Sequence, residues 1–191
     1  MPLRRAYCVK EVYHTQASGA RFDVVMSAAQ QAAFERALVK DFDSIQTRLS
    51  KVDVRQAECR NKIEQEAILG ELDGEVGLME CNRLVFGLLR GALAAQGRAA
   101  LDRLPANKRG TSSLINNLGY LLKAQGDLAG AEVLYREALQ ARRETLGDRH
   151  MDTLDSINNL GVLLKAQGDL AGAEVLYREA LQARRETLGD R

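Results

Sequence analysis

The C-terminal part of this 191-residue chain is one sequence unit written twice. Residues 114–149 align with residues 156–191 at a period of 42 positions, and only two of the 36 aligned pairs differ: Leu114 against Ser156, and Tyr120 against Val162. Repeats of roughly 20–50 residues are typical of solenoids, in which each unit buries its apolar face on its neighbour. Aromatic residues make up only 5% of the chain and proline occurs twice, which favours helix over sheet. The repeat therefore predicts stacked helical units and an all-α fold.

Each unit is expected to form a helix–turn–helix hairpin. Polar N-cap candidates precede the first helix of each copy: Thr111 and Ser112 in one, Asp152 and Thr153 in the other. Gly126 stands where that helix would end in the left-handed conformation, and Asp127 can cap the second helix. Apolar residues at helical spacing predict the buried faces: Ile115, Leu118, Gly119 and Leu122 on the first helix, and Leu128, Ala131, Leu134, Tyr135, Ala138 and Leu139 on the second.

The spacing Ile115-x₂-Leu118-Gly119-x₂-Leu122, followed by Ala131-x₃-Tyr135, resembles the tetratricopeptide repeat (TPR). The segments INNLG, AQGDLAGAEVLYREAL and RRETLGDRH are similar to the kinesin-light-chain type of this repeat, also found in nephrocystin-like proteins. His150-Met151 stands where that type has His-Pro, and the usual closing proline falls on Arg143. The resemblance covers residues 111–191. It implies a short TPR solenoid that acts as a protein-binding scaffold, with a peptide or partner helix held in a concave groove lined by the first helices.

The candidate binding residues lie opposite the buried stripe of each first helix. They are spaced four and three apart, hence on one helical face: Asn116, Tyr120 and Lys123 in the first copy, and Asn158, Val162 and Lys165 in the second. Stacked units would align the asparagine amides into a ladder that suits a peptide backbone, and the lysines would attract acidic residues. The alternative interpretation is that these are solvated polar residues on an exposed face.

The N-terminal region carries a different pattern. Residues 1–26 are expected to be poorly ordered, and residues 27–104 to form a long helix or a helical hairpin. Ser27 and Gln30 make a capping box, and no proline or glycine follows before Gly70. A heptad-like seam runs through this stretch: Leu38, Phe42, Ile45, Leu49, Val52, Gln56, Cys59 and Ile63. A self-associating coiled coil and an intramolecular hairpin both explain it; the segment GELDGEVG, ending at Gly77, is the expected hairpin turn.

Residues 105–110 are the predicted linker to the repeats, which occupy residues 111–149 and 150–191, the second without a capping helix. An uncapped repeat leaves an apolar face open, so we expect a sticky surface around Leu163, Leu170 and Leu181. Homo-oligomerisation could use this surface or the heptad helix. Two alternative functions follow: an assembly subunit whose heptad helix contacts the partner while the repeats are only structural, or a fragment of a longer repeat array.

Several other functions are not expected. A net charge of +1 offers nucleic acid no basic patch, and the most apolar run, residues 84–95, is too short to cross a membrane. Three cysteines without a CxxC pattern fit a reducing, cytoplasmic compartment, with an organelle transit peptide as the alternative. The two histidines, His14 and His150, lack ligand spacing to cysteines or carboxylates. No catalytic residue, metal site or cofactor is predicted, and His150 is expected to have a capping or packing role.

Overall fold

The computed structural model describes residues 6–20 and 25–188. All elements assigned in this part of the chain are helices, which confirms the all-α prediction. The chain divides into two compact units, residues 1–93 and 94–191. The division falls inside helix α5 (Leu78–Asp102) rather than in the predicted linker. Among the helices described, none combines the length and the apolar character that crossing a bilayer requires.

The first unit packs short helices around the start of α5. Its elements are α1 (Ala6–Ala17), α2 (Ala28–Lys40), α3 (Phe42–Ser50), the 3₁₀ turn η2 (Val54–Gln56) and α4 (Lys62–Glu75). Its core is drawn from α1, η2, α4 and α5: Ala6, Val9, Val54, Ala57, Ile68, Leu72, Cys81 and Val85. The Val54 amide donates to Asn82 Oδ1 at 3.1 Å, so η2 is tied to α5 by its backbone as well as by packing.

Two predictions for this unit are wrong. Ala6–Ala17 is helical, although residues 1–26 were expected to be poorly ordered; of that segment, residues 1–5 and 21–24 lie outside the described part. The helix that starts at the confirmed Ser27–Gln30 capping box stops at Lys40, because Asp41 leaves the helical conformation with φ −145°. Helical structure is interrupted again between Ser50, where α3 ends, and Lys62, where α4 begins. The heptad seam therefore does not lie on one helix, and α4 continues through Gly70 and Gly74, so that the expected turn is confined to residues 76–77.

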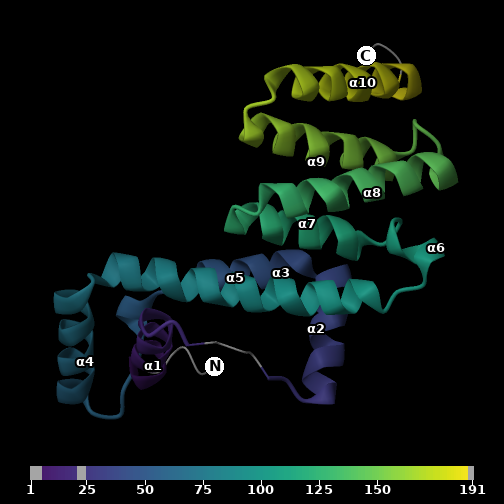
Figure 1. Ribbon diagram of the computed structural model, residues 1–191. Coiled ribbons are helices and arrows are strands. Elements are labelled where there is room, and N and C mark those ends of the chain that lie inside the picture. The colour runs from purple at the N-terminus through teal and green to yellow at the C-terminus, as the bar shows by residue number, and fades with distance from the viewer. Residues whose placement is uncertain (1–5, 21–24, 189–191) are drawn as a thin grey trace. The chain divides into compact units, whose positions relative to one another are not determined.

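The second unit is a stack of helical hairpins. After the end of α5 come the single turn α6 (Ala106–Arg109), which lies in the predicted linker, and then α7 (Ser113–Gln125), α8 (Leu128–Leu146), α9 (Met151–Gln167) and α10 (Leu170–Leu188). Each of the last four helices packs on the next, and Figure 1 shows them stacked in chain order from green to yellow. The predicted apolar stripes are buried, apart from Leu128, which is half-buried.

Local chemistry sets the helix ends in this unit. The Ser112 hydroxyl accepts from the Leu114 amide, and Asp127 Oδ1 accepts from the Gly130 amide at 2.8 Å. Gly126 adopts φ +86°, the left-handed conformation expected there. The N-cap of α9 differs from the prediction: it is His150, whose Nδ1 accepts from the Asp152 amide at 3.2 Å. Asp152 is thus already inside the helix, and Thr153 is buried with its hydroxyl donating to the Gly147 carbonyl.

Leu163 does not belong to an exposed surface. Its side chain, on α9, is 0% exposed, whereas Leu170 is 65% and Leu181 50% exposed. The predicted sticky surface is therefore wrong in its first member, because the Leu163 side chain is fully buried. The other two residues lie on α10.

Candidate functional site

The six predicted binding residues lie on α7 and α9, two helices in contact with each other. Their exposure is uneven: Asn116, Lys123 and Asn158 are half-buried, Tyr120 is 41% and Val162 43% exposed, and Lys165 is exposed. The Lys123 ammonium lies 5.6 Å from the centre of the Tyr120 ring, within the range of a cation–π contact. The first copy therefore presents an aromatic ring with a cation above it, whereas the second presents Val162 at the position of the ring.

Asn116 is held by an arginine that the sequence pattern did not single out. With its amide oxygen turned toward α8, Asn116 Oδ1 accepts from Arg142 Nη1 at 2.6 Å and from Nη2 at 3.2 Å. Arg142 Nη1 also donates to the Asp152 carbonyl at 3.0 Å and to Ser156 Oγ at 2.8 Å. One guanidinium thus joins α7, α8 and α9, and it fixes the orientation of the Asn116 amide.

Arg142 is an unusual buried charge. It is 5% exposed, its Nε has no hydrogen-bond partner within the described residues, and its three acceptors are a neutral amide, a carbonyl and a hydroxyl. Burial lowers the pKa of the guanidinium below its ordinary value, and the carboxylates of Asp152 and Asp155 counter part of that effect. A charge desolvated in this way is stable only while all its acceptors stay in place. Arg142 therefore stabilises the contact between the two repeats only when α7 and α9 hold its acceptors in these positions.

The second copy has no such arrangement in the described residues. Arg184, the counterpart of Arg142, is 42% exposed in its side chain and lies 3.8 Å from Asp155 Oδ1. Asn158, the counterpart of Asn116, has no hydrogen-bond partner among the described residues. The two asparagines of the predicted ladder are thus unequal: the Asn116 amide has its oxygen fixed on Arg142, and no described residue occupies the donor or the acceptor of the Asn158 amide.

The sequence did contain a signal for Arg142. Ser156 is one of the two positions at which the copies differ, and its hydroxyl is the group that meets the arginine. The matching residue, Leu114, is 3% exposed in the core of the unit. A hydrophobe exchanged for a serine at a buried position of a nearly identical repeat indicates a buried polar partner, and Arg142 is that partner.

A separate cavity of about 540 Å³ lies in the first unit. Its walls are mostly apolar and come from α2, α3 and α5, with Phe34, Ile45, Leu49, Leu89 and Leu93 among them. Ile45 and Leu49 belong to the predicted heptad seam, so two seam residues line this cavity rather than a coiled coil. Sequence reasoning could not find it, because it requires α3 to fold back toward α5.

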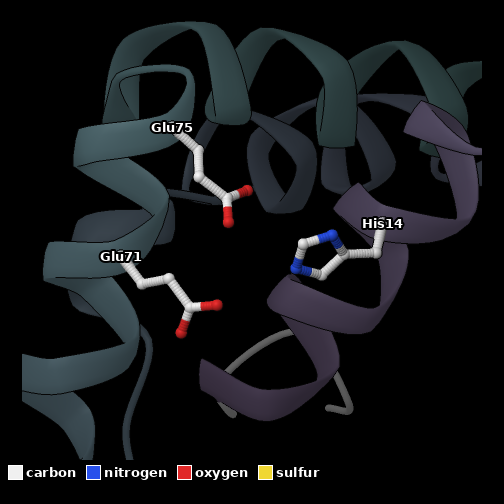
Figure 2. A group of neighbouring side chains, drawn as sticks. All are labelled: His14, Glu71 and Glu75. Atoms are coloured by element: carbon white, nitrogen blue, oxygen red, sulfur yellow. The ribbon is translucent and has the colours of Figure 1, made fainter.

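Figure 2 shows a polar group between α1 and α4, formed by His14, Glu71 and Glu75. One ligand atom from each lies within 4.8 Å of the others, and an imidazole with two carboxylates is a set that zinc accepts. All three side chains are exposed, and Lys10 Nζ already pairs with Glu71 Oε2 at 2.5 Å. The packing of the two helices thus brings together residues far apart in sequence, but an exposed group with a bound lysine assigns no metal.

Comparison with known families matches one part of the chain. Residues 110–186 fit the family model of the tetratricopeptide repeat. This segment contains α7, α8, α9 and most of α10, and the match supports the tetratricopeptide repeat that the spacing predicted. Repeats of this family are non-catalytic and mediate protein–protein interaction. A comparison with curated proteins finds no match.

Proposed function

We propose that this TPR protein is a non-catalytic scaffold that binds a peptide or partner helix on the face shared by α7 and α9. The observation that carries the proposal is Asn158, a half-buried amide that has no hydrogen-bond partner among the described residues and lies beside the exposed Val162 side chain. A half-buried amide of this kind is suited to pair with a peptide group, which offers one donor and one acceptor.

The neighbouring residues give this face its selectivity. Asn116 has its amide oxygen on Arg142, so this amide is held in one orientation toward the face. Tyr120 and Val162 provide apolar contact area, and Lys123 and Lys165 provide positive charge at one end of each helix. We therefore expect a ligand segment with apolar side chains and at least one acidic residue. The kinesin-light-chain type of the repeat and a reducing, cytoplasmic location belong to the same proposal; the three free thiols are consistent with the latter.

Affinity capture with single-residue variants tests this proposal. The unmodified chain, Asn158→Ala and Asn159→Ala are immobilised, and captured proteins are compared by mass spectrometry. Asn159 is the matched control, because it is the same residue type on the same helix, turned away by one position and also half-buried. We expect Asn158→Ala to lose a partner that Asn159→Ala retains. Equal recovery by all three chains would remove the amide face from the mechanism.

The alternative function places the partner on the first unit. The observation in its favour is the cavity of about 540 Å³ between α2, α3 and α5, whose mostly apolar walls suit the apolar side chains of an amphipathic helix. Leu49→Glu introduces a charge into the cavity wall while leaving α7 and α9 untouched. Loss of the partner in Leu49→Glu, with retention in Asn158→Ala, would favour the alternative; the reverse result would favour the repeats.

A further inference from the structure

We propose that the outward face of α10 is a self-association surface that pairs with the same face of a second copy of this chain. The face is formed by residues that recur at spacings of three and four, as on an amphipathic helix: Leu170, Ala173, Glu174, Tyr177, Arg178 and Leu181. With Lys165 at its edge, it encloses a shallow hollow of about 330 Å³.

In the first repeat, the residues that correspond to this face are covered by another helix. Leu139 on α8 is the counterpart of Leu181 on α10, yet it is 5% exposed and Leu181 is 50%. Tyr135 is buried, whereas its counterpart Tyr177 is only half-buried. The two helices have the same sequence from end to end, so the side chains do not cause the difference. It arises because α9 packs on α8, and no described helix packs in that way on α10.

Not every exposed apolar residue on α10 is a difference between the two repeats. Val133 on α8 and Val175 on α10 are both 65% exposed, so this position faces solvent in either repeat. Several residues are more exposed on α10 than their counterparts on α8, and Leu170, Tyr177 and Leu181 of the α10 face are among them. That face therefore presents a surface that the same fold buries one repeat earlier, and Val175 marks the opposite side of the helix.

The charged residues of this face, Glu174 and Arg178, are complementary to the same two residues on a second copy. Glu174 and Arg178 lie on either side of the middle of the apolar row, with Leu170 and Leu181 toward its ends. If a second copy approaches through a two-fold axis near Leu176, midway between Glu174 and Arg178, the two α10 helices run antiparallel. Glu174 then faces Arg178 of the second copy twice over, and Leu170 faces Leu181. A two-fold interface requires this kind of self-complementary patch, and opposite charges at its rim favour the matched register.

The charges are available for this role. Glu174 and Arg178 are paired within their own helix at 2.6 Å, but their side chains are 59% and 80% exposed. An exposed pair of this kind contributes little on its own, so it can be shared with a second copy at little cost. The apolar row supplies the burial, and the charges select the second copy over an unrelated apolar surface.

Sedimentation velocity of the 191-residue chain, from low to high micromolar concentration, tests the proposal. We expect a concentration-dependent monomer–dimer equilibrium. Leu181→Glu should raise the dissociation constant of the dimer by about 30-fold or more, because it places a charge against the apolar Leu170 of the second copy. Val175→Glu is the matched control, the same substitution on the opposite side of the same helix, and should leave the constant unchanged. Circular dichroism checks that both variants stay helical.

A charge exchange tests the two-fold register. Glu174→Arg and Arg178→Glu alone should each weaken the dimer, whereas the double variant should restore it, because opposite charges again meet. A chain that stays monomeric at every concentration overturns the proposal, and so does a dimer that Leu181→Glu leaves intact or that the double variant does not restore. The proposal does not rest on peptide binding, since Asn158→Ala leaves the α10 face unchanged and should dimerise normally.

Discussion

At the scale of single residues, the repeat provides an internal comparison, because identical side chains meet different surroundings. Arg142 is buried among three acceptors from two other helices, whereas Arg184 is half-exposed beside one carboxylate. Arg142→Ala leaves the Ser156 hydroxyl and the Asn116 amide without their donor. We expect it to lower the free energy of unfolding by about 2 kcal/mol, measured by urea denaturation.

Arg184→Ala is the control for this prediction. It removes the same atoms from a site that water already reaches, and we expect a loss below about 1 kcal/mol. Both variants are measured at low micromolar concentration, so that self-association does not contribute. If the two substitutions cost the same, the buried arginine does not stabilise the stacking of α7, α8 and α9.

A second comparison concerns the glycines that face the tyrosine rings. A Cβ on Gly119 would lie 2.5 Å from Tyr135, and one on Gly161 would lie 2.8 Å from Tyr177. Tyr135 is 2% exposed and enclosed by α9, so it cannot move aside, whereas Tyr177 is half-buried and can. Gly119→Ala should therefore destabilise the chain by about 1–3 kcal/mol.

Gly161→Ala should be close to neutral, because the gain in helix propensity, about 0.5–1 kcal/mol, offsets a small shift of Tyr177. Thermal unfolding of both variants measures the difference. A larger loss in Gly161→Ala than in Gly119→Ala would contradict the exposure of the α10 face, since it would require Tyr177 to be the more tightly enclosed ring.

At the scale of secondary-structure elements, the repeats could be predicted from sequence because their signals are local. Gly126, Asp127 and Ser112 act within one turn of themselves, and each has the predicted capping role. The N-terminal unit could not be predicted in the same way. No proline or glycine near Asp41 marks the first break. At the second break, between α3 and α4, Val54 of η2 is hydrogen-bonded to Asn82, a residue far away in sequence. Periodicity cannot report such contacts.

For the candidate binding face, too, one part could be predicted from sequence and another part could not. Which residues share the face of α7 or α9 follows from helical spacing, so Asn116 and Asn158 could be found. Their different states could not, because these depend on whether Arg142 reaches a correctly placed Ser156 on the next helix. Such a contact joins residues 14 positions apart on different helices. Its one signal in the sequence is the exchange of Leu114 for Ser156 between the two copies.

The junction of α8 with α9 gives a prediction for pH. Gln167 donates to Glu132 at 2.8 Å across the two helices, and Arg136 pairs with the same carboxylate. These hydrogen bonds lower the pKa of Glu132 below its ordinary value. The contribution of Glu132 to stability is therefore present above the unfolded pKa, about 4.3, and is lost as pH falls through the lower folded pKa.

Glu132→Gln should cost less than about 1 kcal/mol at neutral pH, and its deficit relative to the unmodified chain should shrink below about pH 4. Glu174→Gln is the control at the matching position of α10, where no described glutamine bridges to the carboxylate. Urea denaturation over a pH series measures both, and a deficit that stays constant through the acid range would refute the linkage.

At the scale of the whole molecule, the division inside α5 implies that the end of this helix belongs to the repeats. Leu101 on α5 is 0% exposed, and Arg109 bridges Asp102 to Glu137 on α8 at 2.8 and 2.7 Å. Arg98 reaches Asp127, the N-cap of α8, at 3.9 Å. The last turns of α5 thus contribute to the core of the second unit, as a neighbouring repeat would in a longer stack.

Two fragments test this role of α5. Residues 94–191 retain Leu101 and Asp102, and should unfold in one cooperative transition, because the unit keeps its complete core. Residues 106–191 lose both, and should be less stable by at least about 2 kcal/mol, the cost of taking one buried leucine from a core. Equal stability of the two fragments in urea denaturation would mean that α7 needs no cover from α5, and that the repeats form a unit by themselves.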